Sequence, residues 1–174
     1  MSQLTIGDLY SKRDLADELD EGNLRLVREG IYNFKSESRT FLFVDLEKEG
    51  KKDRFHFDDY FEEDWFHWDS QTTQHLNSPK IQEIINGERE VHLFARVVQK
   101  IKSQTQPFVY CGRLAFDMYD PNKTSKPIHI RFLSLDFQDD TPNEHLQAIY
   151  QWKPHKAGKA PSNTIPPSWA PSEE

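Results

Sequence analysis

The chain has very little cysteine and no long apolar run. These two absences argue against a disulfide-stabilised fold and against a membrane-spanning protein. Cys111 is the only cysteine among 174 residues, so the fold cannot depend on an internal disulfide. No apolar stretch approaches the roughly 20 residues that cross a bilayer. Residues 1–10 lack the basic-then-apolar pattern of a secretory signal. We therefore expect a cytoplasmic protein with no membrane partner.

The common sequence signatures of catalytic and cofactor sites are also missing. The seven histidines show neither His-x-His nor His-x-x-x-His spacing, and no glycine-rich phosphate loop is present. Asp45, Glu47 and Lys48 approach the composition of a nuclease site, but the nearest acid-x-Lys triplet, 49–51, falls in an expected turn. We expect no cofactor, no metal and a non-catalytic binding module. A metal-dependent nucleic-acid hydrolase using Asp45, Glu47 and Asp69 is the less favoured alternative.

The balance of charge is acidic overall but uneven along the chain. The net charge is −7, which argues against a general nucleic-acid coat, because such proteins are usually basic. Residues 1–90 hold 12 Lys/Arg against 21 Asp/Glu, whereas residues 91–159 hold 10 against 6. The second half could therefore face phosphates. The acidic first half leaves a second function open, that of a protein-interaction or regulatory subunit without nucleic-acid binding.

Aromatic residues are plentiful at 13 %, and the pattern is mostly that of strands. We predict an α+β fold, a β-rich single domain with a curved sheet or small barrel and two or three short helices. This domain covers residues 1–152, and residues 153–174 form a proline-rich disordered tail. The expected helices are 11–19, 78–86 and 143–150, the first capped by Ser11 and ended by Gly22. The expected strands include 30–34, 40–46, 91–101, 107–118 and 127–137, with turns at 49–53 and 120–122. Strand 40–46 is expected to be buried on both faces, and 127–137 alternates with a period of two.

The densest motif is the aromatic and polar run 65–73, Trp-Phe-His-Trp-Asp-Ser-Gln-Thr-Thr. One interpretation is structural: a buried strand end whose tryptophan N–H groups find partners, followed by a polar turn. The functional interpretation is a pocket with a flat aromatic wall, since a planar base stacks on such rings and polar side chains read its edge. The predicted base-binding residues are Trp65, His67, Trp68, Asp69, Ser70, Gln71 and Thr72.

Four basic residues of the expected later strands are predicted phosphate contacts: Arg96, Lys100, Arg113 and Arg131. Arg96 follows an apolar segment, so it is either a phosphate ligand or a surface arginine on an edge. Arg113 follows Gly112, and a glycine inside a strand often marks a bulge that aims a neighbouring side chain. Cys111 is typical of an inert core thiol rather than a nucleophile.

The order and spacing of these motifs resemble a known family over residues 8–137. The family is a C-terminal domain of unknown function in bacterial restriction proteins that join a phospholipase-D-like nuclease to a superfamily-2 helicase. The resemblance is carried by 9–16, 41–46, 66–73, 93–96 and 108–114, and the Phe-x-Trp-x-Ser-Gln block is its most specific part.

The resemblance implies a module that senses modified DNA, such as methylated cytosine, and licenses a nuclease. It places Trp68, Ser70 and Gln71 in the recognition pocket, with Arg96 and Arg113 as the basic flank. We therefore predict a DNA-binding module that recognises modified or flipped bases and is associated with restriction or defence. Its expected partners are DNA, most simply a modified duplex, and a separate nuclease or helicase subunit.

Overall fold

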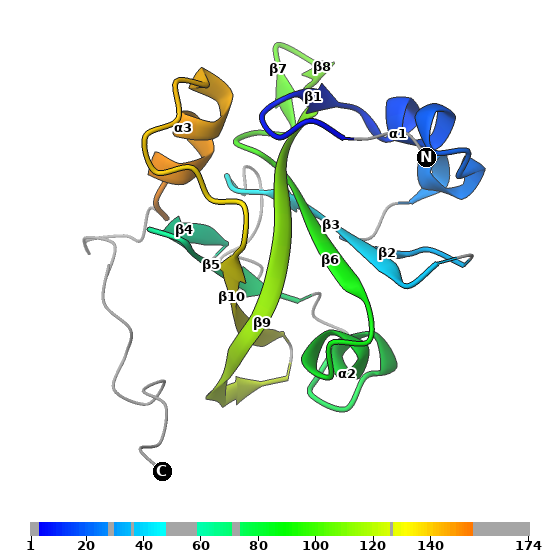
Figure 1. The fold of residues 1–174 in the computed structure, drawn as a ribbon, viewed down its shortest axis with the longest axis vertical. Coiled ribbons are helices and arrows are strands. Elements are labelled where there is room, and N and C mark those ends of the chain that lie inside the picture. Colours follow the sequence, from blue (N-terminus) through cyan, green and yellow to red (C-terminus); the bar gives the residue numbers. More distant parts are fainter. Residues whose placement is uncertain are drawn as a thin grey trace.

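One mixed sheet organises the fold, which we describe from a computed structural model for residues 4–27, 30–35, 37–47, 59–70, 74–125 and 127–154. The strand order is β2-β3-β6-β9-β10-β5-β4, with β1 paired to β9 (Figure 1). β3 and β6 are parallel and the other pairs are antiparallel. Among the described residues the end strands β2 and β4 do not pair with each other, so the sheet is open and the α+β prediction is confirmed, without a closed barrel.

The strands and helices have the following bounds. The strands are β1 Leu9–Tyr10, β2 Ile31–Asn33, β3 Arg39–Asp45, β4 Tyr60–Glu62, β5 Trp65–Asp69, β6 Glu90–Arg96, β7 Lys100–Ile101, β8 Gln104–Thr105, β9 Phe108–Thr124 and β10 Ile128–Ser134. The helices are α1 Lys12–Glu18, the 3-10 helix η1 Gly22–Leu26, α2 Pro79–Ile85 and α3 Glu144–Gln151. Within the described part of the chain, no helix is long and apolar enough to cross a membrane.

The helix ends follow from local hydrogen bonds. Ser11 caps α1, since its side chain accepts from the Asp14 amide while the Asp14 carboxylate accepts from the Ser11 amide. α1 ends one residue earlier than predicted, with Leu19 as its C-cap, and Gly22 begins η1 instead of ending α1. Asn143 caps α3 by accepting from Leu146 N at 3.0 Å. Nearby side chains therefore set where α1 and α3 begin.

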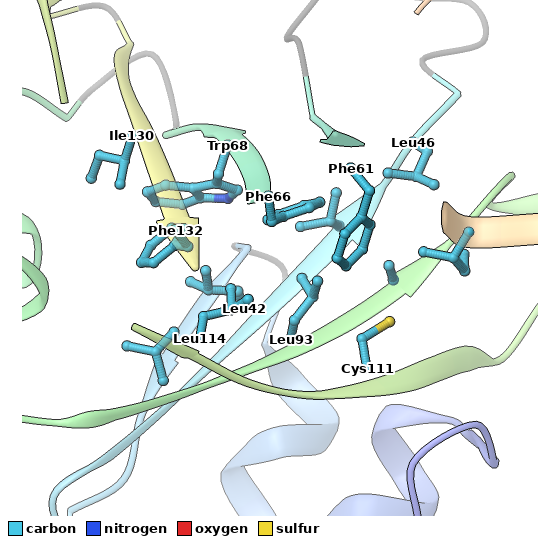
Figure 2. Close-up of a cluster of buried hydrophobic side chains, with 14 of the residues drawn as sticks. Leu42, Leu46, Phe61, Phe66, Trp68, Leu93, Cys111, Leu114, Ile130 and Phe132 are labelled. Carbon is cyan, nitrogen blue, oxygen red and sulfur yellow. The ribbon is translucent and has the colours of Figure 1, made fainter. Parts of the chain in front are cut away.

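The central strands are buried on both faces, as predicted for β3. Leu42 and Val44 belong to a mixed aliphatic and aromatic core, whereas Phe41 and Phe43 belong to a second core of mainly aromatic residues against α1 and η1. Alternate side chains of a strand point to opposite faces, so a strand between two cores must be apolar at every position. Figure 2 shows part of the first core, which packs on the inner face of β5 and β10.

The pairing of β9 is irregular at three places, one against β6 and two against β10. Leu93 pairs with Gly112 but Phe94 pairs with Tyr110, so the predicted bulge at Gly112 is confirmed, with φ of +90° at this glycine. The predicted turn at 120–122 does not separate β9 from β10, because β9 continues to Thr124, although Asn122 N donates to Asp120 Oδ1 at 2.9 Å in a local turn there. The pairing with β10 slips there, and proline at position 121 suits an irregular site since it has no N–H to donate.

Two other strands end well before their predicted ends. The predicted strand 127–137 ends at Ser134 as β10. The predicted strand 91–101 ends at Arg96, and a separate β7–β8 hairpin follows it. The predicted turn at 49–53 and the tail from residue 155 onward lie outside the described residues.

Candidate functional site

The alternation of β5 and β10 creates one apolar and one charged face. Phe66 and Trp68 of β5 lie in the first core, whereas His67 and Asp69 point to the opposite face. On β10, His129 pairs with Asp69 and Arg131 with His67, so both strands contribute charged side chains to one surface. We call this surface the polar face and define it by its residues: Tyr60, Glu62, Trp65, His67, Asp69, His129 and Arg131.

The two tryptophans of the 65–73 motif lie on opposite faces of the sheet, so they do not form one wall. Trp68 is 3 % exposed and packs beside Phe132 and Ile130 in the first core (Figure 2). Trp65 is half-buried and lies 4.3 Å from the Arg131 guanidinium. Trp68 is therefore a core residue, and of the two tryptophans only Trp65 lies where a ligand on the polar face could stack.

A chain of hydrogen-bonding groups crosses three strands of the polar face. Glu62 Oε1 lies 3.2 Å from His67 Nε2, and His67 Nδ1 lies 3.3 Å from His129 Nε2. His129 Nδ1 contacts an oxygen of Asp69, whose other oxygen accepts from Lys123 Nζ at 3.2 Å. The carboxylate of Asp69 is fully buried, and such a group is stable only when paired in this way.

The protons of these hydrogen-bonded groups can be placed in one consistent way. With Asp69 ionised, His129 donates from Nδ1 to Asp69, and His67 donates from Nδ1 to His129 Nε2. The remaining nitrogen of a neutral His67 is then an acceptor, so Glu62 must be protonated to donate to it. Burial raises the pKa of Glu62 and lowers that of His67 to about 3, and both shifts favour this arrangement.

Two polar atoms of the polar face have no hydrogen-bond partner in the described structure. They are Nη1 of Arg131 and Oε2 of Glu62, and both are buried. The other nitrogens of Arg131 are engaged, with Nε donating to Asp117 at 2.7 Å and Nη2 contacting the same carboxylate. Buried polar atoms are rarely left unpaired, so each is a position where a ligand could add a hydrogen bond.

The aromatic residues of the polar face are its most exposed parts. Tyr60 stacks on His67 with ring centroids 4.5 Å apart and an interplanar angle of 10°. Tyr60 and Trp65 are half-buried, whereas the charged members are buried. A cavity of about 420 Å³ exists beside α3, but its lining, which includes Phe137 and Tyr150, contains none of these residues. The charged side chains of the polar face are therefore buried, and its aromatic rings lie nearest to solvent.

The low pKa of His67 predicts how stability changes with pH. Burial is the main cause that lowers this pKa from 6.5 to about 3, with smaller contributions from the nearby His129 and Arg131 that outweigh the opposing effect of Asp69. The unfolded chain therefore binds a proton below pH 6.5 that the folded chain does not bind. Since the unfolded state holds more protons, stability falls as pH falls, by up to about 1.4 kcal/mol per pH unit from this group.

We expect urea titrations from pH 7.5 to 5.5 to show this loss in the wild type and a weaker one in His67→Gln. His145→Gln, on the exposed side of α3, is the matched control and should keep the wild-type slope. Glu62, whose raised pKa acts in the opposite direction at lower pH, is left in place in both variants. Equal slopes in His67→Gln and wild type would contradict the account.

Of the remaining predicted base contacts, only Ser70 lies among the described residues. Ser70 is buried at the end of β5, where its Oγ accepts from Ile128 N at 3.0 Å, so it fastens β5 to β10. Gln71 and Thr72 lie outside the described residues.

The predicted phosphate contacts are spread over the sheet. Arg96 pairs with Asp45, donates to Gln106 O at 2.7 Å and lies 4.0 Å from the Phe108 ring. Arg113 is half exposed but pairs with Asp136, and Lys100 is exposed in the β7–β8 hairpin. Arg131 is 4 % exposed, so of the four it alone belongs to the polar face.

The carboxylates proposed for a hydrolase are not gathered together. Asp45 pairs with Arg96 on β6, Glu47 accepts from Trp152 Nε1 at 3.2 Å, and Asp69 pairs with His129. In the sheet, β6, β9 and β10 separate β3 from β5. Among the described residues no group of three His, Cys, Asp or Glu is placed to hold a metal ion.

Several residues of the polar face were not predicted. Tyr60, Glu62 and His129 were missed, and only the period-two pattern of 127–137 placed His129 and Arg131 on one face in advance. The register between β5 and β10, which brings His129 to Asp69, joins residues 60 positions apart and has no local signal.

The fold and site define a small α+β domain with a charged cluster buried on one face of an open sheet. The chain belongs to the family described as Domain of unknown function (DUF3427), which matches residues 4–144. This match confirms that the chain is a domain of unknown function of a known family, while the attached nuclease and helicase stay a prediction. No curated protein matches the chain.

Solved structures with a partly similar fold include two SUVH proteins and a restriction enzyme. Arabidopsis thaliana SUVH6 in complex with SAM is 14 % identical with a TM-score of 0.47, over 78 % of this chain and 26 % of that chain. The SRA domain of SUVH5 in complex with fully methylated CG DNA is 14 % identical with a TM-score of 0.47, over 80 % of this chain and 94 % of that chain. The MspJI restriction endonuclease in complex with a 27-mer oligonucleotide is 10 % identical with a TM-score of 0.41, over 62 % and 33 %. The chain thus spans about a quarter of the SUVH6 chain and a third of the MspJI chain.

Proposed function

We propose that this chain is a non-catalytic DNA-binding module that recognises a modified or flipped base on its polar face. The observation that carries the proposal is Arg131, a buried arginine with an unpartnered Nη1 beside the ring of Trp65. A guanidinium held in this way donates to a base oxygen or ring nitrogen, and an adjacent ring provides a stacking surface.

The chemistry of the face suits the edge of a base. Arg131 supplies a donor, and Oε2 of Glu62 supplies an unpartnered acceptor, because the Glu62 proton lies on Oε1 toward His67. Oε2 can therefore accept a hydrogen bond from an exocyclic amine. The two groups flank His67 on neighbouring strands. Entry requires Tyr60 and Trp65 to move aside or to stack on the base, and these are the members that solvent reaches. The TM-scores below 0.5 add no weight to this assignment.

The surrounding contacts are assigned by exposure. We propose Lys100 and Arg113 as phosphate contacts, because their side chains reach solvent. Arg96 acts by positioning Phe108 and Gln106, and Arg131 acts as a base reader rather than a phosphate ligand. In this proposal the module works in the cytoplasm in restriction or defence, and a separate nuclease or helicase subunit supplies any cleavage.

The proposal is tested by fluorescence anisotropy with Trp65→Ala beside the wild type. Matched duplexes carry plain, methylated, hydroxymethylated or phosphorothioated sites, with a single strand as the control. We expect the wild type to prefer one modified duplex at low and moderate salt, since phosphate contacts weaken with salt and ignore the base. Loss of one stacked base, worth about 1–3 kcal/mol, should reduce that preference roughly 5- to 150-fold in Trp65→Ala.

A second function is favoured by the charge of the first 90 residues, which carry 21 acids against 12 bases. A protein-interaction subunit would bind none of the duplexes in either form and would co-purify with a fixed partner. That combined result would replace the DNA-binding proposal.

A further inference from the structure

The β7–β8 hairpin contributes no residue to the polar face. Lys100 pairs with Thr105 and Ile101 with Gln104, so Lys102 and Ser103 form a two-residue turn. The hairpin is a separate two-stranded sheet, and in Figure 1 it projects beyond the main sheet next to β1. All four of its strand residues are exposed.

The surface of the hairpin is basic and apolar in an otherwise acidic protein. No Asp or Glu occurs between Val91 and Phe116, although the whole chain carries a charge of −7. Neither Lys100 nor Lys102 is ion-paired with a described residue, unlike Arg96 and Arg113. Ile101 is 52 % exposed between the two lysines, which leaves an apolar side chain in water without an internal packing role.

Both residues of the turn have an unfavourable backbone conformation. Lys102 and Ser103 have φ of +49° and +68°, the left-handed region that hairpin turns usually fill with Asn-Gly. Strained backbone of this kind persists only where the surrounding structure or a function requires it. Here the stem is fixed, because Gln106 N donates to Gln99 O at 2.8 Å and Arg96 donates to Gln106 O at 2.7 Å. Arg96 thus links the base of the hairpin to β6.

We propose that this hairpin is a second DNA contact that enters the major groove of a duplex, with Ile101 against the base edges and Lys100 and Lys102 on the flanking phosphates. The inference rests on the proposed function, in that the protein must bind duplex DNA. The major groove is wide enough for a two-stranded β-ribbon, and apolar side chains there contact thymine methyl groups. The two lysines supply the complementary charge.

The test uses the full chain, the same duplexes and a salt series. Lys100→Ala/Lys102→Ala should weaken binding to every duplex alike and reduce the slope of log affinity against log salt by about 1.8, or about 0.9 for each phosphate that the variant no longer neutralises. Ile101→Gln should weaken binding several-fold on all duplexes and leave the slope unchanged. Both variants should keep the preference for a modified base that Trp65→Ala loses.

Matched controls lie elsewhere on the surface. Arg13→Ala/Lys35→Ala removes two exposed positive charges, and Leu26→Gln removes an apolar side chain that is 77 % exposed. If the hairpin variants bind like wild type, or no more weakly than these controls, the hairpin inference is overturned while the polar-face proposal stands. If the wild type binds no duplex, both are overturned.

Discussion

Trp68→Ala is expected to reduce the free energy of unfolding by about 3–5 kcal/mol. Trp68 is 3 % exposed and packs against Phe132 and Ile130, so truncation removes its buried area and leaves a cavity in the first core. A small domain has about 5–15 kcal/mol of stability in total, which makes this loss a large part of the whole. Urea denaturation followed by tryptophan fluorescence or circular dichroism measures it.

Trp65→Ala is the matched variant within the same motif. It removes a half-buried ring and a cation–π contact with Arg131, worth about 0.5–2 kcal/mol, so its unfolding midpoint should stay much closer to wild type. Loss of binding in Trp68→Ala would therefore report damage to the core, whereas loss in Trp65→Ala reports the site. Equal stability losses in the two variants would contradict the assignment of opposite faces.

Asp69→Ala should also cost about 3–5 kcal/mol, through a different mechanism. The Asp69 carboxylate is fully buried and receives hydrogen bonds from His129 and Lys123. Its removal leaves His129, which is 6 % exposed at its side chain, with a buried donor and no acceptor on that side. Asp69→Asn keeps the shape and one acceptor, so a smaller loss is expected from the same chemical denaturation experiment.

A surface ion pair gives the control for this prediction. Asp17 pairs with Arg25, and both side chains are at least half exposed. Asp17→Ala should therefore cost no more than about 1 kcal/mol. If Asp69→Ala proves as mild as Asp17→Ala, the charged network does not stabilise the polar face, and its buried pairing has been misassigned.

The local parts of the fold could be predicted from sequence because their causes are local. The Ser11 capping box, the two-faced burial of 40–46 and the bulge at Gly112 each depend on a few neighbouring residues. The turn expected at 120–122 does not end β9, because pairing with β10 on both sides of it, at Tyr119 and Thr124, keeps the segment within the strand. Tertiary pairing there overrides local turn preference.

The candidate site was only partly predictable for a related reason. The 65–73 motif contributes Trp65, His67 and Asp69 to the polar face, but placing Trp65 and Trp68 in one wall ignored the two-residue period of a strand. That period puts positions three apart on opposite faces. His129 and Arg131 reach His67 and Asp69 only through a register between distant strands. Chemistry that depends on such long-range pairing cannot be predicted from one segment.

The most direct test of the central claim is a double-mutant cycle between Arg131 and the base modification. Wild type and Arg131→Met are each titrated against the preferred modified duplex and its plain counterpart, with Arg113→Met as a half-exposed control. The account predicts that Arg131→Met loses at least roughly tenfold more affinity for the modified duplex than for the plain one, a coupling of about 1.4 kcal/mol or more. Arg113→Met should weaken both alike. Equal losses on both duplexes in Arg131→Met would show that this arginine does not read the base, and would contradict the account.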